Sequence, residues 1–315
     1  MKIVVLDGHT ENPGDLSWAE LEKLGNVTVY DFSEPAEACA RMINAEIVLT
    51  NKTVISREMI EQSTRLRMIG VLATGFNVVD IDAAAERCIP VCNVPSYATE
   101  AVAQYTFALL LELCHRVGAH DRAVQEGRWT QGKEFCFWDY PQIELNGKTM
   151  GLIGYGRIGQ AVGRIAAAFG MKVLHFSPSG REGGVSLEEV LRQSDVLSLH
   201  CPLTAENHHL INAETLSMVK PGVLLLNTAR GSLIDEAALR KALLNGQVAG
   251  AAVAEREPIP ADSPLLGLNN CLITPHIAWA AREARQRLMD TVVENVRAFQ
   301  QGNPVNVVNG VSLSR

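Results

Sequence analysis

The residues Thr149-Met-Gly-Leu-Ile-Gly154-Tyr-Gly156-Arg-Ile-Gly159 decide the fold, and a helical pattern follows them from Gln160 to Phe169. An apolar run that leads directly into G-x-G-x-x-G and then into a helix is the context that the dinucleotide-binding fingerprint requires. Gly154 permits a tight turn, Gly156 lets the main chain approach a pyrophosphate, and Gly159 lets the helix pack close to the strand. The pattern predicts a dinucleotide site.

The helix that starts after these turns adds a second reason to expect phosphate binding. Arg157, Ile158 and Gly159 lead into this helix and are expected cofactor contacts, because the N–H groups and partial positive charge of a helix N-terminus attract phosphate. Glycine-rich turns also recur by chance, so the motif alone would be weak evidence. Its place between a strand and a helix favours the binding function.

The next expected strand, Lys172–Phe176, is followed by Ser177 rather than by an acidic residue. A carboxylate there would accept a hydrogen bond from the ribose 2′-hydroxyl of NAD, whereas a nearby Arg accommodates the 2′-phosphate of NADP. Ser177 and Arg181 therefore favour NADP over NAD as the cofactor. The alternative is that Ser-Pro-Ser-Gly is a plain loop.

Short apolar runs alternate with helical patterns along the whole chain, which predicts parallel sheets covered by helices. The strands are expected at Lys2–Leu6, Val27–Tyr30, Ile47–Thr50, Met68–Val71, Val91–Val94, Thr149–Ile153, Lys172–Phe176, Val196–His200, Val223–Asn227, Val248–Val253 and Cys271–Thr274. Helices of the first half are expected at Trp18–Leu24, Ser56–Gln62 and Ile81–Arg87.

Two long helices, expected from Ala98 to Glu126 and from Ala281 to Gln301, connect two similar halves of the 315-residue chain. We therefore expect an α/β protein with two Rossmann-like domains, each a doubly wound parallel sheet, and a cleft between them. Residues 1–98 and 283–315 would form a discontinuous substrate domain. Residues 99–282 would form the dinucleotide-binding domain.

The composition argues against several classes of partner. Apolar residues make up 47% of the chain and the net charge is −7, with no cluster of Lys and Arg, so we expect neither nucleic acid nor an anionic membrane as a partner. No run is apolar over the ~20 residues that a membrane span needs, and the N-terminus turns acidic too soon for a signal peptide. Seven scattered cysteines without a C-x-x-C pair indicate a cytoplasmic protein, and no metal site is expected.

Polar residues follow three successive strands near the end of the chain, where open α/β sheets place their ligands. Arg230, Glu257 and His276 can therefore converge on one site. Arg binds a carboxylate through two parallel hydrogen bonds, and His exchanges a proton with a carbonyl oxygen near neutral pH. A carboxylate beside the His would raise its pKa. Each residue alone has an ordinary structural explanation, but together they predict a dehydrogenase of small 2-keto or 2-hydroxy acids.

Nearly the whole chain resembles the D-isomer-specific 2-hydroxyacid dehydrogenases, and within them the glycerate dehydrogenase and hydroxypyruvate reductase group. The resemblance implies a flavodoxin-like substrate domain, an NAD(P)-binding domain and a homodimer built on the nucleotide-binding domain through the helix after Tyr97. The matching segments are Ala73–Asn77, Asn93–Glu100, Gly147–Gly159, Ser198–Thr204, Leu226–Asp235 and Pro275-His276, with Trp279 typical of the glycerate and hydroxypyruvate enzymes.

The resemblance also implies a role for each matching residue. His276 would be the acid–base residue, Glu257 would pair with it, and Arg230 would anchor the substrate carboxylate and keto oxygen. Backbone N–H groups of Ala73, Thr74 and Gly75 would receive the same carboxylate. The other expected cofactor contacts are Cys201 and Pro202 beside the adenosine, and Thr228 and Ala229 beside the nicotinamide.

Two stretches depart from the family pattern. The run Gly250–Pro258 is two residues shorter and lacks an Asp that normally holds the nicotinamide carboxamide, which leaves Glu255 as an alternative to Glu257. The stretch from Ser177 to Leu187 is also short. Either the chain has lost these residues or the sequence as written omits them. An unbroken chain through Val253 and Ala254 would indicate a true loss.

The expected reaction is reduction of hydroxypyruvate or glyoxylate to D-glycerate or glycolate with NADPH or NADH. The alternatives are a dehydrogenase of the same fold for phosphoglycerate, D-lactate, phosphite or formate, and a dinucleotide-sensing protein without catalysis. We expect Asn51, Lys52 and Phe76 to select the substrate. Phe135–Trp138 either line the same cleft from across the dimer or pack against the partner subunit.

Overall fold

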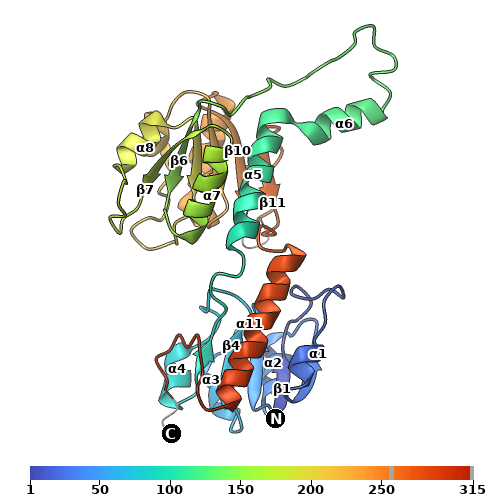
Figure 1. Cartoon of the computed structure of the whole chain (residues 1–315), viewed down its shortest axis with the longest axis vertical. Helices are drawn as coiled ribbons and strands as arrows, with labels where there is room; N and C mark the ends of the chain where they lie inside the picture. Colours follow the sequence, from blue (N-terminus) through green and yellow to red (C-terminus); the bar gives the residue numbers. More distant parts are fainter. Residues whose placement is uncertain (255–258, 313–315) are drawn as a thin grey trace. The chain divides into compact units, whose positions relative to one another are not determined.

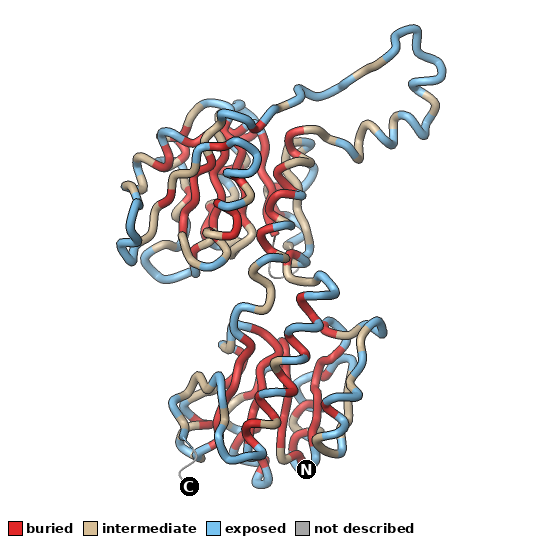
Figure 2. Tube along the Cα trace, in the orientation of Figure 1, coloured by how far each residue is buried: buried red, intermediate tan, exposed pale blue. Residues whose placement is uncertain are grey.

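The computed structural model describes residues 1–254 and 259–312, which belong to two compact units (Figure 1). Unit 1 comprises Met1–Ala98 and Ala280–Arg315, and unit 2 comprises Thr99–Trp279. The chain returns to unit 1 at Ala280, three residues before the expected boundary. Each unit has its own buried interior, which follows the strands of its sheet (Figure 2).

The sheet of unit 1 has the strand order β2-β1-β3-β4-β5, and all its pairs are parallel. This is the flavodoxin-like order, so the expected fold of this unit is confirmed. Both faces of β3 and β4 are buried, which explains why these strands are continuous apolar runs. The strands are β1 (Lys2–Val5), β2 (Asn26–Val29), β3 (Ile47–Thr50), β4 (Met68–Val71) and β5 (Val91–Cys92).

Helices cover both faces of this sheet. Leu288, Val292 and Val296 of α11 (Arg282–Gln300) pack against one face, and Met42 and Ile60 belong to the cluster on the other. The second cluster draws on α2 (Pro35–Met42), which the sequence analysis left unassigned although Glu34 and Glu37 form a capping box around Pro35. The remaining helices are α1 (Ala19–Glu22), α3 (Arg57–Gln62) and α4 (Ile81–Glu86).

The sheet of unit 2 is also parallel, with the order β11-β10-β9-β8-β6-β7. The chain winds outward from β6 to β7 and then continues on the other side of β6 with β8, so the direction of winding reverses between β6 and β8. The strands are β6 (Thr149–Ile153), β7 (Lys172–Phe176), β8 (Val196–Leu199), β9 (Val223–Asn227), β10 (Val248–Ala254) and β11 (Cys271–Thr274). The helices are α7 (Arg157–Ala168), α8 (Leu187–Gln193), α9 (Ala213–Met218) and α10 (Glu236–Leu244), with a 3₁₀ turn at Gly231–Leu233.

The long helix expected from Ala98 to Glu126 is wrong as a single element. It consists of α5 (Thr99–His115) and α6 (Val117–Gln125), separated by Arg116 in the left-handed conformation with a φ of +49°. A left-handed residue interrupts the helical hydrogen-bond ladder, and nothing in the apolar pattern of the sequence signals it. The break sends α6 and the following segment away from the sheet of unit 2 (Figure 1), and no residue from 115 to 144 is buried (Figure 2).

Candidate active site

The glycine turn after β6 owes two of its glycines to close packing. Gly154 has a φ of +98°, and a Cβ there would lie 2.6 Å from the backbone nitrogen of Cys201, just beyond the neighbouring β8. A Cβ on Gly159 would lie 2.3 Å from the carbonyl oxygen of Gly154, so α7 can approach the strand this closely only at a glycine. Around a Cβ built on Gly156, no atom of the described residues lies within 4 Å. Gly156 therefore leaves room for a ligand.

The same turn fits a dinucleotide in its charge as well as in its shape. Gly156 is the N-cap of α7, a helix of 12 residues, so the first-turn N–H groups and the positive end of the helix dipole face the turn. Arg157 is exposed in that first turn, and Ile158 packs against the interior of unit 2. The turn also lies where the winding of the sheet reverses, which is where open α/β sheets bind ligands.

The loop after β7 lies next to this turn. Gly154 donates a backbone hydrogen bond of 2.9 Å to the carbonyl oxygen of Phe176, and Ser177 follows at once. The Ser177 and Ser179 hydroxyl oxygens are 2.9 Å apart, and Arg181 is exposed on the same loop. Hydroxyl groups and a guanidinium therefore occur near the place where the sequence analysis expects the 2′ position of the adenosine ribose.

The two strands that precede Arg230 and His276 flank the same strand, β10. Val253 of β10 is registered against Asn227 of β9 and against Ile273 of β11. Arg230 follows Asn227 by three residues, and His276 follows Ile273 by three residues. The structure thus brings both segments to the same edge of the sheet.

The turn that carries Arg230 is held by the buried side chain of Asn227, which is 1% exposed. Its Nδ2 donates to the Arg230 carbonyl oxygen at 2.7 Å, and its Oδ1 accepts from the Ala229 N–H at 3.0 Å. The Arg230 Nη1 donates to the Ala229 carbonyl oxygen at 2.7 Å. The hydroxyl of Thr228 lies 3.1 Å from that of Thr106 on α5. This network orders the turn before any ligand arrives.

His276 adopts an uncommon backbone conformation for a residue other than glycine, with a φ of +53°. Its N–H donates to the Thr274 carbonyl oxygen at 2.8 Å, which closes a tight turn directly after β11. The side chain is half-buried. Unusual backbone conformations of this kind concentrate at functional sites, where the surrounding structure maintains them.

Glu257 and its alternative Glu255 lie outside the described residues. The preceding strand, however, is described and continuous: Val253 and Ala254 of β10 are registered against Ile273 and Thr274 of β11.

Cys201 and Pro202 follow β8, beside the glycine turn. Cys201 is buried, which raises the pKa of its thiol, and Asn207 holds the Pro202 carbonyl oxygen with a hydrogen bond of 2.7 Å. The preceding residue, His200, has no role in the sequence analysis. Burial lowers its pKa to about 4, and its Nε2 lies 2.8 Å from the Ser198 hydroxyl. A neutral imidazole therefore supports the backbone against which Gly154 packs.

In unit 1, the segment Ala73–Gly75 follows β4 at the carboxyl edge of the sheet. Asn93 Nδ2 donates to the Thr74 carbonyl oxygen at 2.7 Å, and the Thr74 hydroxyl donates to the Val94 carbonyl oxygen at 2.8 Å. Thr74 and Gly75 are exposed, and their N–H groups have no acceptor among the described residues. The segment is thus rigid and presents hydrogen-bond donors outward, as a receptor for a carboxylate requires.

One buried acidic residue of unit 1 escaped the sequence analysis. Glu11 is fully buried beyond the end of β1, and burial together with the negative charge of Asp7 raises its pKa to about 8. Asp7 and Glu11 carry the same signal as Arg230 and His276, because they are polar residues that follow a parallel strand, β1.

Among residues 1–254 and 259–312, no group of three or more His, Cys, Asp or Glu side chains is placed to hold a metal ion. No helix there is both long and apolar enough to span a membrane.

A family model, related sequences and solved structures all match this chain. Residues 107–278 match the family model described as D-isomer specific 2-hydroxyacid dehydrogenase, NAD binding domain. A hydroxypyruvate reductase of Blautia hydrogenotrophica is 52% identical over 98% of this chain and 100% of its own length. A glycerate dehydrogenase of Methylorubrum extorquens is 42% identical over 87% of this chain and 88% of its own. Among solved structures, an acyclic imino acid reductase in complex with NADPH and D-Arg superposes with a TM-score of 0.85 at 34% identity, over 98% of this chain and 100% of that one.

Proposed function

Since this chain belongs to the D-isomer-specific 2-hydroxyacid dehydrogenase family and is therefore an oxidoreductase that uses a nicotinamide dinucleotide, we propose that it reduces hydroxypyruvate to D-glycerate and glyoxylate to glycolate. The observation that carries this choice of substrate is the 52% identity, over 98% of the chain, to a protein named hydroxypyruvate reductase. We assign unit 1 as the substrate domain and unit 2 as the dinucleotide-binding domain.

The proposed mechanism gives each residue one task. The N–H groups of Ala73, Thr74 and Gly75 and the guanidinium of Arg230 would bind the substrate carboxylate, because Arg matches its two oxygens in a bidentate manner. His276 would donate a proton to the C2 carbonyl oxygen in reduction and accept it in oxidation. The bound cofactor supplies the hydride that adds to C2. Exclusion of water would strengthen each of these charge interactions.

Each part of the cofactor can be assigned to its own set of residues in the same way. Gly154, Gly156, Arg157, Ile158 and Gly159 would hold the pyrophosphate. We propose that Ser177 and Arg181 bind a 2′-phosphate, so that NADPH is preferred to NADH. The adenosine would lie beside Cys201 and Pro202, and the nicotinamide beside Thr228 and Ala229.

We propose Glu257 as the carboxylate that pairs with His276, with Glu255 as its alternative. Substituting Glu257 by Gln should move the alkaline limb of the pH profile for reduction to lower pH, because a carboxylate partner favours the charged imidazole that donates the proton. Glu255→Gln is the matched control. If Glu255→Gln shifts the profile and Glu257→Gln does not, the pairing has to be reassigned.

The decisive experiment measures oxidation of NADPH and NADH with a panel of substrates. Hydroxypyruvate and glyoxylate are compared with phosphohydroxypyruvate and pyruvate, and the reverse reaction is tried with phosphite and formate. A kcat/KM for hydroxypyruvate well above that for the others supports the proposal. Preference for another member assigns the chain to a different substrate, and tight cofactor binding without any turnover would indicate a dinucleotide sensor.

We also propose that the protein is a homodimer through unit 2. The arm formed by α6 and residues 126–142 exposes Trp138 (66%) and Phe135 (87%) and contains an apolar groove of about 350 Å³ lined by Trp129, Phe137 and Trp138 among others. Exposed aromatic side chains gathered on one segment are typical of an interface. Light scattering should give twice the chain mass. The double substitution Phe135→Glu with Trp138→Glu should reduce the measured mass to that of one chain. The control substitution Phe32→Glu on unit 1 should leave the mass unchanged.

A cytoplasmic location is proposed on separate grounds. All seven cysteines carry free thiols, and a reducing compartment keeps thiols in that state. Immunofluorescence or fractionation of the producing cells tests this directly.

A further inference from the structure

The sheet of unit 1 has its own reversal of winding, between β1 and β3, and a buried carboxyl group lies there. Glu11 follows β1 and is 0% exposed. One of its carboxyl oxygens accepts a hydrogen bond from Nδ2 of Asn51, which follows β3, and the other accepts from the Thr10 hydroxyl at 3.1 Å. Asn51 Nδ2 also donates to the Thr10 hydroxyl at 2.9 Å. The proposed mechanism leaves this group without a task.

The main chain of the same turn is held from the other side by Asp7. The Asp7 carboxylate accepts hydrogen bonds from the N–H groups of Asn51, Lys52 and Thr53 at 2.8, 2.6 and 2.7 Å. Asp7 therefore fixes the backbone of the turn, and Glu11 fixes the Asn51 side chain. Together they determine where Lys52, an exposed residue, leaves the sheet.

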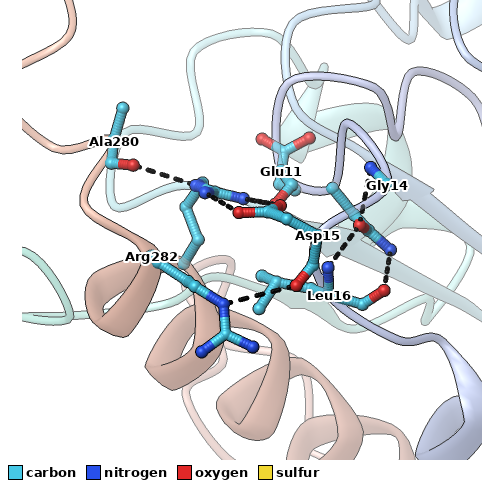
Figure 3. Close-up of polar contacts among 8 residues, drawn as sticks. Glu11, Gly14, Asp15, Leu16, Ala280 and Arg282 are labelled. Atoms are coloured by element: carbon cyan, nitrogen blue, oxygen red, sulfur yellow. Dashed lines mark hydrogen bonds and ion pairs between the residues drawn. The ribbon is translucent and has the colours of Figure 1, made fainter.

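The loop that carries Glu11 is itself anchored to α11 (Figure 3). Arg285 Nη1 donates to the Glu11 carbonyl oxygen at 3.0 Å, and the two Nη atoms bind the Asp15 carboxylate at 2.7 and 2.6 Å. Arg285 Nε donates to the Ala280 carbonyl oxygen at 2.9 Å, where the chain re-enters unit 1. In Figure 3 the Glu11 carboxyl group points away from Asp15, and Arg285 binds only the main-chain carbonyl oxygen of Glu11 among its printed contacts with this residue.

The register of the sheet puts Lys52 next to the expected carboxylate receptor. Thr50 of β3 is registered against Val71 of β4, and the Leu72 N–H donates to the Thr50 carbonyl oxygen at 2.8 Å. Two residues further along each strand, Lys52 and Ala73 follow on neighbouring strand ends. We propose that Glu11 is a positioning residue: it holds Asn51 and so keeps the Lys52 ammonium beside the Ala73–Gly75 N–H groups, where it adds to their attraction for the substrate carboxylate. This rests on the proposed function.

The charges around Glu11 explain why a neutral carboxyl suits this task. Burial and, to a lesser extent, the charge of Asp7 at the end of β1 raise the pKa of Glu11, while the Thr10 hydrogen bond and Lys52 at the end of β3 lower it. Burial and the charge of Glu11 raise the pKa of Tyr97, and the charge of Arg285 on α11 is paired with Asp15. With its proton retained near neutral pH, Glu11 does not compete with the substrate for Lys52. When Glu11 loses its proton, its negative charge is repelled by the Asp7 carboxylate and attracts the Lys52 ammonium.

The test compares Glu11→Gln and Glu11→Ala with wild type, and uses Glu20→Gln, an exposed carboxylate on α1, as the control. The KM for hydroxypyruvate and kcat are measured from pH 6.5 to 9.5. The wild-type KM should rise above about pH 8, and the Glu11→Gln profile should be flat, because the amide oxygen can still accept from Asn51 but the amide does not ionise. Glu11→Ala should raise KM roughly 10-fold at every pH with little change in kcat, because the buried Asn51 amide loses one of its two acceptors and keeps only the Thr10 hydroxyl. Identical KM profiles for wild type and Glu11→Gln, or an unchanged KM in Glu11→Ala, would overturn the proposal.

A second measurement does not depend on turnover. Hydrogen–deuterium exchange of the amides of Asn51, Lys52 and Thr53 should be faster in Glu11→Ala and should match wild type in Glu11→Gln. Equal exchange in Glu11→Ala and wild type overturns the positioning role. If the wild type turns over no 2-keto acid while exchange follows the expectation, the proposed substrate is wrong but Glu11 still holds the turn. If Glu11→Ala does not fold, the pH dependence of KM in Glu11→Gln still tests the proposal.

Discussion

Arg230 and His276 each lie three residues beyond a position that is registered against Val253, because Asn227 of β9 and Ile273 of β11 flank the same residue of β10. Two strand spacings separate β9 from β11, which amounts to about 10 Å at the sheet edge. Side chains as long as Arg and His can reach one small molecule across that distance. The relationship comes from strand order and register, and it makes the two residues the first to be tested.

Replacing His276 by Asn should lower kcat by a factor of ~10²–10⁴, the usual cost of losing general acid–base catalysis. The dissociation constant of the dinucleotide, measured by fluorescence titration, should stay the same. His115→Asn at the end of α5 is the control, since the Nδ1 of this ring lies 3.1 Å from Oε1 of the exposed side chain of Gln142. Turnover close to wild type in His276→Asn would remove this residue from the mechanism.

Replacing Arg230 by Lys keeps the positive charge but loses the fork that matches a carboxylate. We expect KM for the keto acid to rise roughly 10-fold or more, because a hydrogen bond to a charged group contributes about 1.5–3 kcal/mol. Steady-state kinetics checks this, with Arg192→Lys on the exposed surface of α8 as the control. An unchanged KM would mean that Arg230 does not bind the carboxylate.

Alanine substitution should separate the two kinds of glycine in the turn. Gly154→Ala should destabilise unit 2 by at least ~1–2 kcal/mol, because it places a Cβ at positive φ and against the backbone of Cys201. Gly156→Ala should leave the melting temperature nearly unchanged and weaken dinucleotide binding. Thermal melts and binding titrations of both variants decide the matter. A Gly156→Ala variant that binds NADPH as the wild type does would contradict the proposed approach of the pyrophosphate.

Ser177→Asp should reverse the proposed cofactor preference. A carboxylate accepts from the 2′-hydroxyl of NADH and repels the 2′-phosphate of NADPH. The ratio of kcat/KM for NADPH to that for NADH should fall about 10-fold or more, given the size of one charge–charge contact. Ser217→Asp on α9 serves as the control. A ratio that does not change would place the 2′-phosphate elsewhere.

The stability of the protein should depend on pH through Glu11. The carboxyl titrates near 4.5 when unperturbed and near 8 in the folded protein, so between these values the folded chain keeps a proton that the unfolded chain has lost. The free energy of unfolding therefore falls as the pH rises from about 4.5 to 8. Glu11→Gln should lose less stability over this interval, by an amount on the order of a few kcal/mol. Urea unfolding at pH 5 and pH 8.5 tests this, and a Glu20→Gln control should behave as the wild type.

Some elements were predictable from the sequence because their signals are local. The strands Ile47–Thr50 and Met68–Val71 occur as expected, since a strand buried on both faces must be an uninterrupted apolar run. The break at Arg116 was missed, because a single left-handed residue leaves the apolar pattern of α5 and α6 intact. The expectation that Arg230 and His276 share an edge follows from the rule that parallel strands end on the same side.

The sequence by itself determined that the chain forms two α/β units, that a dinucleotide turn follows β6, and that polar residues end the later strands. Each of these properties depends on residues that are close together in the sequence. Only the tertiary structure decided which strand ends are adjacent and what the buried polar groups touch. Glu11 shows the difference: its partner Asn51 is 40 residues away in the chain, and no local pattern connects them. The hydrogen bond between them exists because the winding of the sheet places β1 beside β3, and burial then changes the chemistry of the carboxyl group.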